Sequence, residues 1–158
     1  METIKKLDLT NLDDMINLRL GIQNYDSKFL DELEILISEK ELRERTRKYL
    51  MQSLNDNLHM FGYFIDNKLI ANCGFYIDKH FPTYNTPNGI TGYICNVFTL
   101  EEYRNKGYQR KLFQDVLSNA KKMGITYFKL SSINVNAIKM YESFGFTLSD
   151  HMYTFRMD

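Results

Sequence analysis

Arg104-Asn105-Lys106-Gly107-Tyr108-Gln109-Arg110 marks the point where the sequence changes from a strand pattern to a helix pattern. The residues before it, 90–100, are rich in branched and aromatic side chains, which favour a β-strand. Apolar residues after it recur at helical spacing: Leu112, Phe113, Val116, Leu117 and Ala120. The glycine between the two patterns predicts a turn that opens a helix.

This turn also has the composition of a phosphate-binding site. The first N–H groups of a helix lack main-chain acceptors and lie at its positive end. Basic residues surround the same turn: Arg104, Lys106, Arg110 and Lys111. They suit a pyrophosphate better than a single carboxylate. The alternative is an ordinary surface turn, and spacing alone does not decide between the two.

The rest of the chain predicts a mixed α/β fold with helices on both faces of a mixed sheet. Strands are expected at 4–9, 58–65, 69–78 and 125–130, with one or two more within 146–157. Helices are expected at 10–22, 38–54 and 134–144, and a loop at 80–89. Residues 27–37 fit a helix or irregular structure equally well. Gly74 predicts a bulge or a close approach of two main chains.

Size and charge narrow the range of functions. A length of 158 residues predicts a single domain, 1–158. Equal numbers of basic and acidic residues, twenty of each, leave no general attraction for nucleic acid. No apolar run approaches the roughly 20 residues of a membrane helix, so we expect a cytoplasmic protein without a membrane partner. Cys73 and Cys95 lie in strand-like runs without metal-ligand spacing, so we expect small buried side chains and no metal.

A second stretch, Asn134-Val135-Asn136-Ala137-Ile138-Lys139-Met140-Tyr141-Glu142-Ser143-Phe144-Gly145-Phe146, completes the pattern. Together with Val97 to Gly107 it resembles the GNAT superfamily of acyl-CoA-dependent N-acetyltransferases. In that family a strand is followed by a six-residue motif that begins with Arg or Gln, continues as X-X-Gly-X, and ends with Gly or Ala. Further along the chain the family has Asn-X-X-Ala-X-X-X-Tyr-X-X-X-Gly-Phe. The resemblance covers about residues 94–146. It implies the GNAT acyl-CoA N-acyltransferase fold, a mostly antiparallel twisted sheet whose fourth and fifth strands splay apart.

The resemblance implies acetyl-CoA as the acyl-donor co-substrate. In the family, the pantetheine arm lies between the splayed strands and the pyrophosphate lies on the turn. Carried over by position, the cofactor-binding residues are Val97, Phe98, Thr99, Arg104, Asn105, Lys106, Gly107, Tyr108, Gln109, Arg110 and Asn134. Gln109 departs from the family, which usually has glycine or alanine there. Its side chain must point away from the phosphates or add a contact.

The resemblance also implies direct attack of a neutral amine on the thioester. The N–H of Phe98 would polarise the thioester oxygen. Tyr141 would act as general acid, because a phenol of pKa about 10 can protonate a developing thiolate. The resemblance does not identify the general base that accepts the amine proton. One branch of the family has glutamate twelve residues before the tyrosine, where this chain has Lys129. Bound water is one alternative, with three weaker candidates: Asn96, Asp78 and His80.

The leading hypothesis is therefore an acetyl-CoA-dependent N-acetyltransferase that acts on a primary amine of a small molecule or peptide. The alternative is a module of the same fold that binds acyl-CoA without catalysis. A nucleotide-binding regulatory domain is disfavoured, because no hydroxyl that could hold magnesium follows Gly107. The acceptor site is expected between the first two helices, the hairpin and the 80–89 loop, with Phe81 and Tyr84 lining it. Partners are acetyl-CoA and the amine, and a homodimer is left open.

Overall fold

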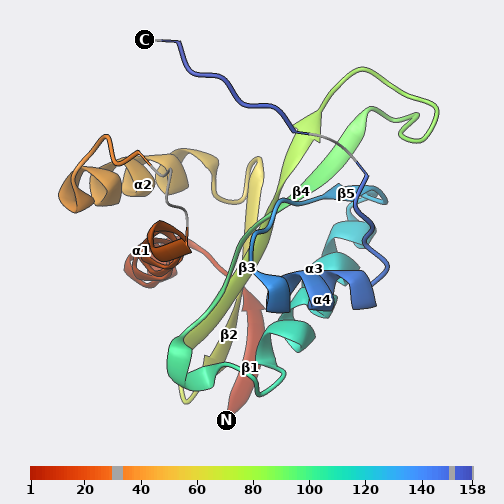
Figure 1. The fold of residues 1–158 in the computed structure, drawn as a ribbon. Helices are drawn as coiled ribbons and strands as arrows, with labels where there is room; N and C mark the ends of the chain where they lie inside the picture. The colour runs from red at the N-terminus through yellow and green to blue at the C-terminus, as the bar shows by residue number, and fades with distance from the viewer. Residues whose placement is uncertain (30–33, 150–151, 158) are drawn as a thin grey trace.

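The central sheet has five strands in the order β1-β2-β3-β4-β5 (Figure 1). The computed structural model describes residues 1–29, 34–149 and 152–157. The strands are β1 (Glu2–Lys6), β2 (Leu58–Ile65), β3 (Lys68–Lys79), β4 (Ile90–Thr99) and β5 (Phe128–Lys129). The first four are antiparallel and β5 runs parallel to β4. The predicted β2–β3 hairpin and the loop before β4 are confirmed.

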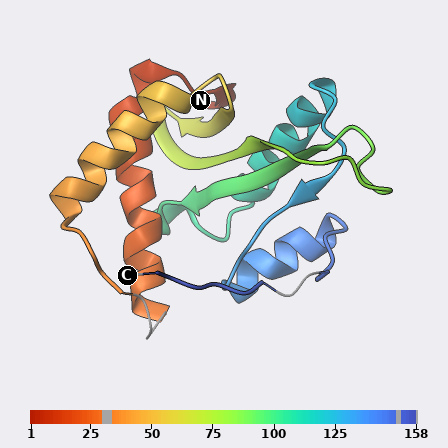
Figure 2. The same ribbon diagram turned by 90° about the horizontal axis from the view of Figure 1, so that it is seen from above.

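The helices cover both faces of this sheet, as the sequence predicted (Figures 1 and 2). They are α1 (Leu12–Phe29), α2 (Glu39–Ser53), α3 (Tyr108–Lys122) and α4 (Val135–Ser143), with short 3-10 turns at Leu9–Asn11 and Glu101–Tyr103. One core cluster joins α1 and α2 to the sheet through Met15, Ile16 and Leu50. The other joins α3 and α4 to the opposite face through Phe113 and Tyr141.

Strands β2 and β3 read as nearly continuous apolar runs because both of their faces are covered. Phe61 and Tyr63 belong to the core under α3, whereas Met60 and Phe64 belong to the core under α1 and α2. Gly74 lies where β3 approaches β2 closely, since an added Cβ there would lie 2.5 Å from the His59 carbonyl oxygen. The predicted close approach at Gly74 is therefore confirmed.

Two irregularities in β4 open the sheet at its centre. Asn72 of β3 pairs with Phe98, whereas Gly74 pairs with Cys95, so β4 carries one extra residue between these pairs. Asn96 in this bulge has a φ of 50°. On the other side, β5 pairs with β4 only at Gly92 and Tyr93. From Ile94 onward β4 and β5 diverge, which is the predicted splay, and it leaves an open edge on β4.

Some expected boundaries were wrong. Helix α1 extends to Phe29, beyond the expected 22, while residues 34–37 are irregular and 30–33 lie outside the described residues. The strand expected at 125–130 is reduced to the two residues of β5. Within 146–157, the described residues 146–149 and 152–157 form no strand, and 150–151 lie outside the described part.

The C-terminal residues lack a strand because they lack a neighbour to pair with. A strand needs an adjacent edge to accept its main-chain hydrogen bonds, and β5 offers only two residues. Residues 152–157 instead run as a single extended segment that leads away from the sheet (Figure 1). There Arg156 lies 3.5 Å from the Glu34 carboxylate. The composition of residues 152–157 favoured a strand, but they do not pair with another strand among the described residues.

Candidate functional site

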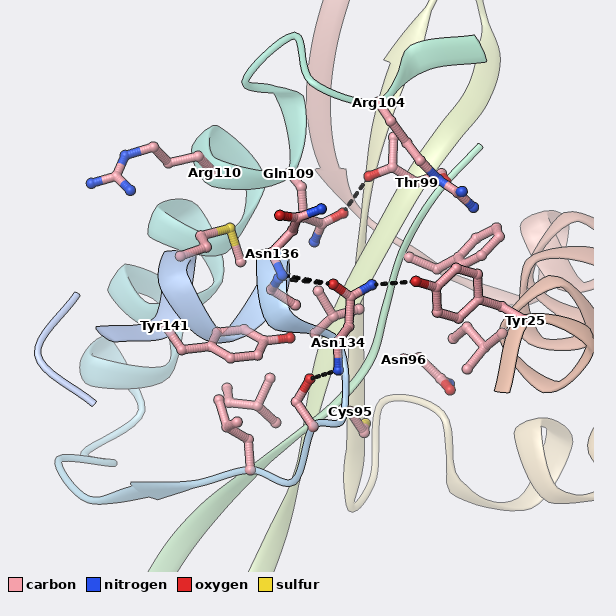
Figure 3. Close-up of a pocket in the computed structure, with 18 of the residues that line it drawn as sticks. Tyr25, Cys95, Asn96, Thr99, Arg104, Gln109, Arg110, Asn134, Asn136 and Tyr141 are labelled. Atoms are coloured by element: carbon pink, nitrogen blue, oxygen red, sulfur yellow. Dashed lines mark hydrogen bonds between the residues drawn. The ribbon is translucent and has the colours of Figure 1, made fainter. Parts of the chain in front are cut away.

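A cavity of about 1010 Å³ lies between α1, the open edge of β4 and the start of α4 (Figure 3). Of the predicted cofactor-binding residues and Tyr141, the structure brings all but one to this cavity. They are Val97, Phe98, Thr99, Arg104, Asn105, Gly107, Tyr108, Gln109, Arg110, Asn134 and Tyr141. Lys106 does not line it: its Nζ donates a 2.9 Å hydrogen bond to the carbonyl oxygen of Glu102 instead.

The turn before α3 leaves the helix start open toward the cavity. Gly107 occupies the N-cap position with a φ of 80°, a conformation that glycine adopts without strain. No side chain of the described residues caps this helix. A Cβ added to Gly107 would meet no described atom within 4 Å, so the space beside the first N–H groups is free. An uncapped helix start of this kind is suited to phosphate oxygens.

Two arginines are fixed beside this helix start. Arg104 donates a 3.0 Å hydrogen bond from Nε to the Thr99 carbonyl oxygen, and its guanidinium lies over the rings of Phe98 and Tyr25. Arg110 donates a 2.6 Å hydrogen bond from Nη1 to Ser143 Oγ. Their charges add to the positive end of α3 at the mouth of the cavity. A pyrophosphate fits this set of donors and charges.

The Gln109 side chain turns toward the sheet and away from the open helix start. Its Oε1 accepts a 2.9 Å hydrogen bond from Thr99 Oγ1, and its Nε2 donates a 3.4 Å hydrogen bond to the Asn72 carbonyl oxygen (Figure 3). The first of the two outcomes expected for Gln109 is therefore the one observed. Its amide ties the first turn of α3 to β3 and β4.

The open edge of β4 presents the main chain of Val97 and Thr99. The Leu100 N–H donates a 2.9 Å hydrogen bond to the Ile70 carbonyl oxygen, and so points toward β3. Main-chain polar groups alternate sides along a strand, so those of Phe98 also point toward β3. By the same alternation those of Val97 and Thr99 point the opposite way, and the hydrogen bond from Arg104 to the Thr99 carbonyl oxygen agrees with this for Thr99. The Phe98 ring packs on Gly21 of α1.

Asn134 connects α4 to α1 across the cavity. Its Oδ1 caps α4 by accepting hydrogen bonds from the N–H groups of Asn136 and Ala137, at 3.0 and 3.1 Å. Its Nδ2 donates a 3.1 Å hydrogen bond to the Tyr25 hydroxyl (Figure 3). The sequence pattern pointed to Asn134 but not to Tyr25, because no motif surrounds Tyr25.

Tyr141 is buried and directs its hydroxyl into the cavity (Figure 3). Its ring packs against Phe113 and Phe146, with centroids 5.4 and 6.1 Å apart. Burial raises the pKa of Tyr141 well above its ordinary value of 10. The phenol therefore keeps its proton at neutral pH and can act as a hydrogen-bond donor toward a group in the cavity.

The acidic residues that line the cavity are Asp26 and Glu101. Burial raises the pKa of Asp26, although the charge of Arg19 acts in the opposite direction. Sequence reasoning missed Asp26; helical spacing from Arg19 and Ile22 is the only signal that could have found it. The base candidates Asp78 and His80 do not line the cavity. His80 instead contacts Thr91 Oγ1 and the Phe81 carbonyl oxygen, both at 2.8 Å.

A second cavity of about 380 Å³ adjoins the first, between α1, α2 and the sheet. Arg19, Cys95 and Asn96 line both cavities. Burial raises the pKa of Cys95 to about 12, so its thiol stays protonated and is a poor nucleophile. Phe81 and Tyr84, expected to line an acceptor site, line neither cavity. They are solvent-exposed because the β3–β4 loop projects beyond the sheet (Figure 1).

The described residues also lack two kinds of feature. No group of three or more His, Cys, Asp or Glu side chains among them could hold a metal ion. None of the helices in this part of the chain combines the length and the apolar character needed to cross a membrane.

Comparisons with known proteins agree with this geometry. Residues 25–146 match the model of the acetyltransferase (GNAT) family. A predicted acetyltransferase from Clostridium acetobutylicum, crystallised with acetyl-CoA, has 23% identity and a TM-score of 0.79 over 99% of this chain and 96% of that one. An N-acetyltransferase from Ralstonia eutropha has 15% identity and a TM-score of 0.83 over 98% and 97%.

An aminoglycoside N-acetyltransferase in complex with CoA has 16% identity and a TM-score of 0.73, over 99% of this chain and 95% of that one. At these identities the three structures establish a shared fold. No protein of curated function matches the sequence.

Proposed function

The chain belongs to the GNAT family of acetyltransferases, and from this we propose that it transfers an acetyl group from acetyl-CoA to a primary amine of a small molecule or peptide. The observation that carries the proposal is the single cavity that joins the uncapped start of α3 to the open edge of β4. These two features together match the two ends of an acyl-CoA: a pyrophosphate and an extended amide-bearing arm.

The residues present fit this co-substrate. The free N–H groups after Gly107, with Arg104 and Arg110 beside them, would hold the pyrophosphate. The main-chain groups of Val97 and Thr99 would pair with the amides of the arm. When bound, acetyl-CoA supplies an acetyl group already activated as a thioester.

We propose that the N–H of Val97, in place of that of Phe98, polarises the thioester oxygen. The direction of the main chain supports this revision, because the polar groups of Phe98 point toward β3. An N–H donor held rigidly in a strand is already oriented before the reaction, which is the condition for effective oxyanion stabilisation.

Tyr141 is proposed to donate a hydrogen bond to the leaving sulfur. Its raised pKa keeps the phenol protonated throughout the neutral range. The same raised pKa makes complete transfer of its proton to a thiolate unfavourable, since a thiol is the stronger acid. The hydroxyl therefore stabilises the developing negative charge mainly as a donor.

Asp26 is proposed as the group that accepts the amine proton, directly or through water. It lines the cavity, and burial raises its pKa toward the range in which a carboxylate is a useful base. We expect kcat/KM to fall as the pH drops below the pKa of Asp26, and Asp26→Asn to abolish that acidic limb. Glu101→Gln is the matched control, and an unchanged limb in Asp26→Asn would exclude the role.

Two measurements test the proposed function. Acetyl-CoA at about 100 times its Kd should stabilise the fold by about 2.7 kcal/mol, seen as a rise in Tm. Thiol release on adding amines should then report turnover. A Tm that does not respond at millimolar acetyl-CoA would refute the proposal. Binding without turnover of any amine would instead favour the non-catalytic acyl-CoA module.

A further inference from the structure

The smaller cavity has a positively charged lining. It opens between α1 and α2 above the sheet and has a volume of about 380 Å³, the size of a small organic molecule. Its charged lining residues are Arg19 and Arg45, and no aspartate or glutamate lines it in the described part of the chain. The remaining surface is largely apolar, formed by Met15, Leu42, Leu50, Leu58 and Met60.

Arg19 lies where the two cavities meet. It is half-buried on α1, and its Nη1 donates a 2.9 Å hydrogen bond to Asn96 Oδ1 in the β4 bulge. Within the described residues it has no carboxylate at ion-pair distance. A guanidinium has five N–H donors in a planar fork that matches a carboxylate or phosphate. Arg19 therefore keeps donors available beside the expected position of the reacting groups.

Arg45 and two hydroxyl groups extend this polar region. Arg45 pairs with Glu41 at 2.7 Å, but both side chains are exposed and one helical turn apart. Exposed pairs of this kind are weak, so an anion in the cavity can compete with Glu41 for Arg45. Thr46 and Tyr49 line the same side. Asp26, the half-buried acid of the larger cavity, does not line the smaller one.

We infer that the acceptor is a primary amine that also carries an anionic group, carboxylate or phosphate, together with an apolar portion. This inference rests on the proposed function. The anion binds Arg19, the apolar portion occupies the cavity between α1, α2 and the sheet, and the amine faces the larger cavity. The amine nitrogen forms a bond to the acetyl carbon as the carbon–sulfur bond breaks. In the net reaction the nitrogen gives up one proton and the released sulfur takes up one, so that CoA leaves as a thiol. Polycationic amines are excluded by charge.

Matched amines test the inference on the full chain. The set is L-leucine, L-leucinamide and 3-methylbutylamine, which share a side chain but differ in charge, with O-phosphoethanolamine against ethanolamine and with spermidine. Binding to CoA-saturated protein is measured by calorimetry, and turnover by thiol release with acetyl-CoA. We expect an anionic member to bind about tenfold or more tightly than its counterpart that lacks the anionic group, as a charged hydrogen bond implies.

A comparison of L-leucine with O-phosphoethanolamine, each against its own counterpart, shows whether the site prefers a carboxylate or a phosphate. Equal or tighter binding of the amines without an anionic group, or of spermidine, would overturn the inference. So would a failure of every amine to bind while acetyl-CoA still raises the Tm, a result that leaves the proposed cofactor site intact. A failure of acetyl-CoA itself to bind would refute the proposed function.

Variants assign the preference to Arg19. In Arg19→Gln, the affinity for an anionic amine relative to that for its counterpart without the anionic group should fall about tenfold or more, and Arg19→Lys should restore part of it. Lys48→Gln removes the same charge from α2 outside both cavities and should leave the ratio unchanged. A merely structural role for Arg19 would weaken both amines alike, and that result would overturn the assignment.

Discussion

Asn134 Nδ2 donates a 3.1 Å hydrogen bond to the Tyr25 hydroxyl, across the cavity and between residues 109 positions apart. The other end of the same amide caps α4. One side chain therefore holds the N-terminus of α4 and links it to α1. This contact joins two walls of the larger cavity, since α1 and α4 face one another there (Figure 3).

The two ends of the Asn134 amide can be separated by substitution. Asn134→Ala removes the cap and the Tyr25 contact and should lower the free energy of unfolding by about 0.5–2 kcal/mol. Asn134→Asp keeps an acceptor for the cap, favoured at a helix N-terminus, and removes only the donor to Tyr25. Urea unfolding should therefore rank Asn134→Asp above Asn134→Ala. Equal losses in both variants would mean that the cap contributes little.

Gly107 is expected to matter for binding more than for folding. Gly107 and Gly124 have φ values of 80° and 84°, and an added Cβ meets no described atom within 4 Å at either. Alanine at each position should thus cost a similar amount, about 1 kcal/mol, through backbone strain alone. Only Gly107→Ala places a methyl group beside the open helix start. Calorimetry with acetyl-CoA should show weaker binding in Gly107→Ala and unchanged binding in Gly124→Ala.

The parts of the site that follow from local sequence were the predictable ones. A glycine between a strand pattern and a helix pattern indicates the turn at Gly107, and the Asn134 to Phe146 motif indicates α4 and Tyr141. The direction of the Gln109 side chain was not predictable, because its partners Thr99 and Asn72 come from two different strands. Contacts between distant segments leave no periodic trace in the sequence.

The same limit explains what the sequence missed. Tyr25 and Asp26 enter the site through the docking of α1 on the open edge of β4, which no motif encodes. The 152–157 segment has strand-like composition, yet whether it pairs depends on the length of β5. Which main-chain groups of β4 face the cavity could not be read from the sequence either, because their direction is set by the register of β4 on β3.

His59 should make stability depend on pH. It is buried beside Phe75, with ring centroids 5.2 Å apart, and neither ring nitrogen has a hydrogen-bond partner among the described residues. Burial, and then the charge of Lys6, lowers the pKa of His59 below its ordinary 6.5, with Asp56 acting in the opposite direction.

The unfolded chain binds a proton at His59 at a higher pH than the folded chain does, so acid favours the unfolded chain. The contribution of His59 is fully present above pH 6.5 and is lost as the pH falls toward its folded pKa. Urea unfolding of His59→Leu and the parent protein between pH 7.5 and pH 5 checks this. The variant should gain stability relative to the parent as the pH falls. A constant difference would show that His59 does not titrate with unfolding.

Tyr141→Phe tests the role of the hydroxyl separately from that of the ring. The ring contacts with Phe113 and Phe146 remain in the variant, so the fold and acetyl-CoA binding should be preserved. Loss of a donor to the leaving sulfur should lower kcat by about a hundredfold or more.

Tyr63→Phe is the matched control for this variant. Tyr63 is another buried tyrosine, and burial, with the neighbouring Glu2, raises its pKa to about 12. Its hydroxyl donates to Glu2, and it does not line the larger cavity. Tyr63→Phe should therefore change the free energy of unfolding while leaving kcat nearly unaltered. If the two variants lost activity in proportion to stability alone, the hydroxyl of Tyr141 would have no part in the reaction.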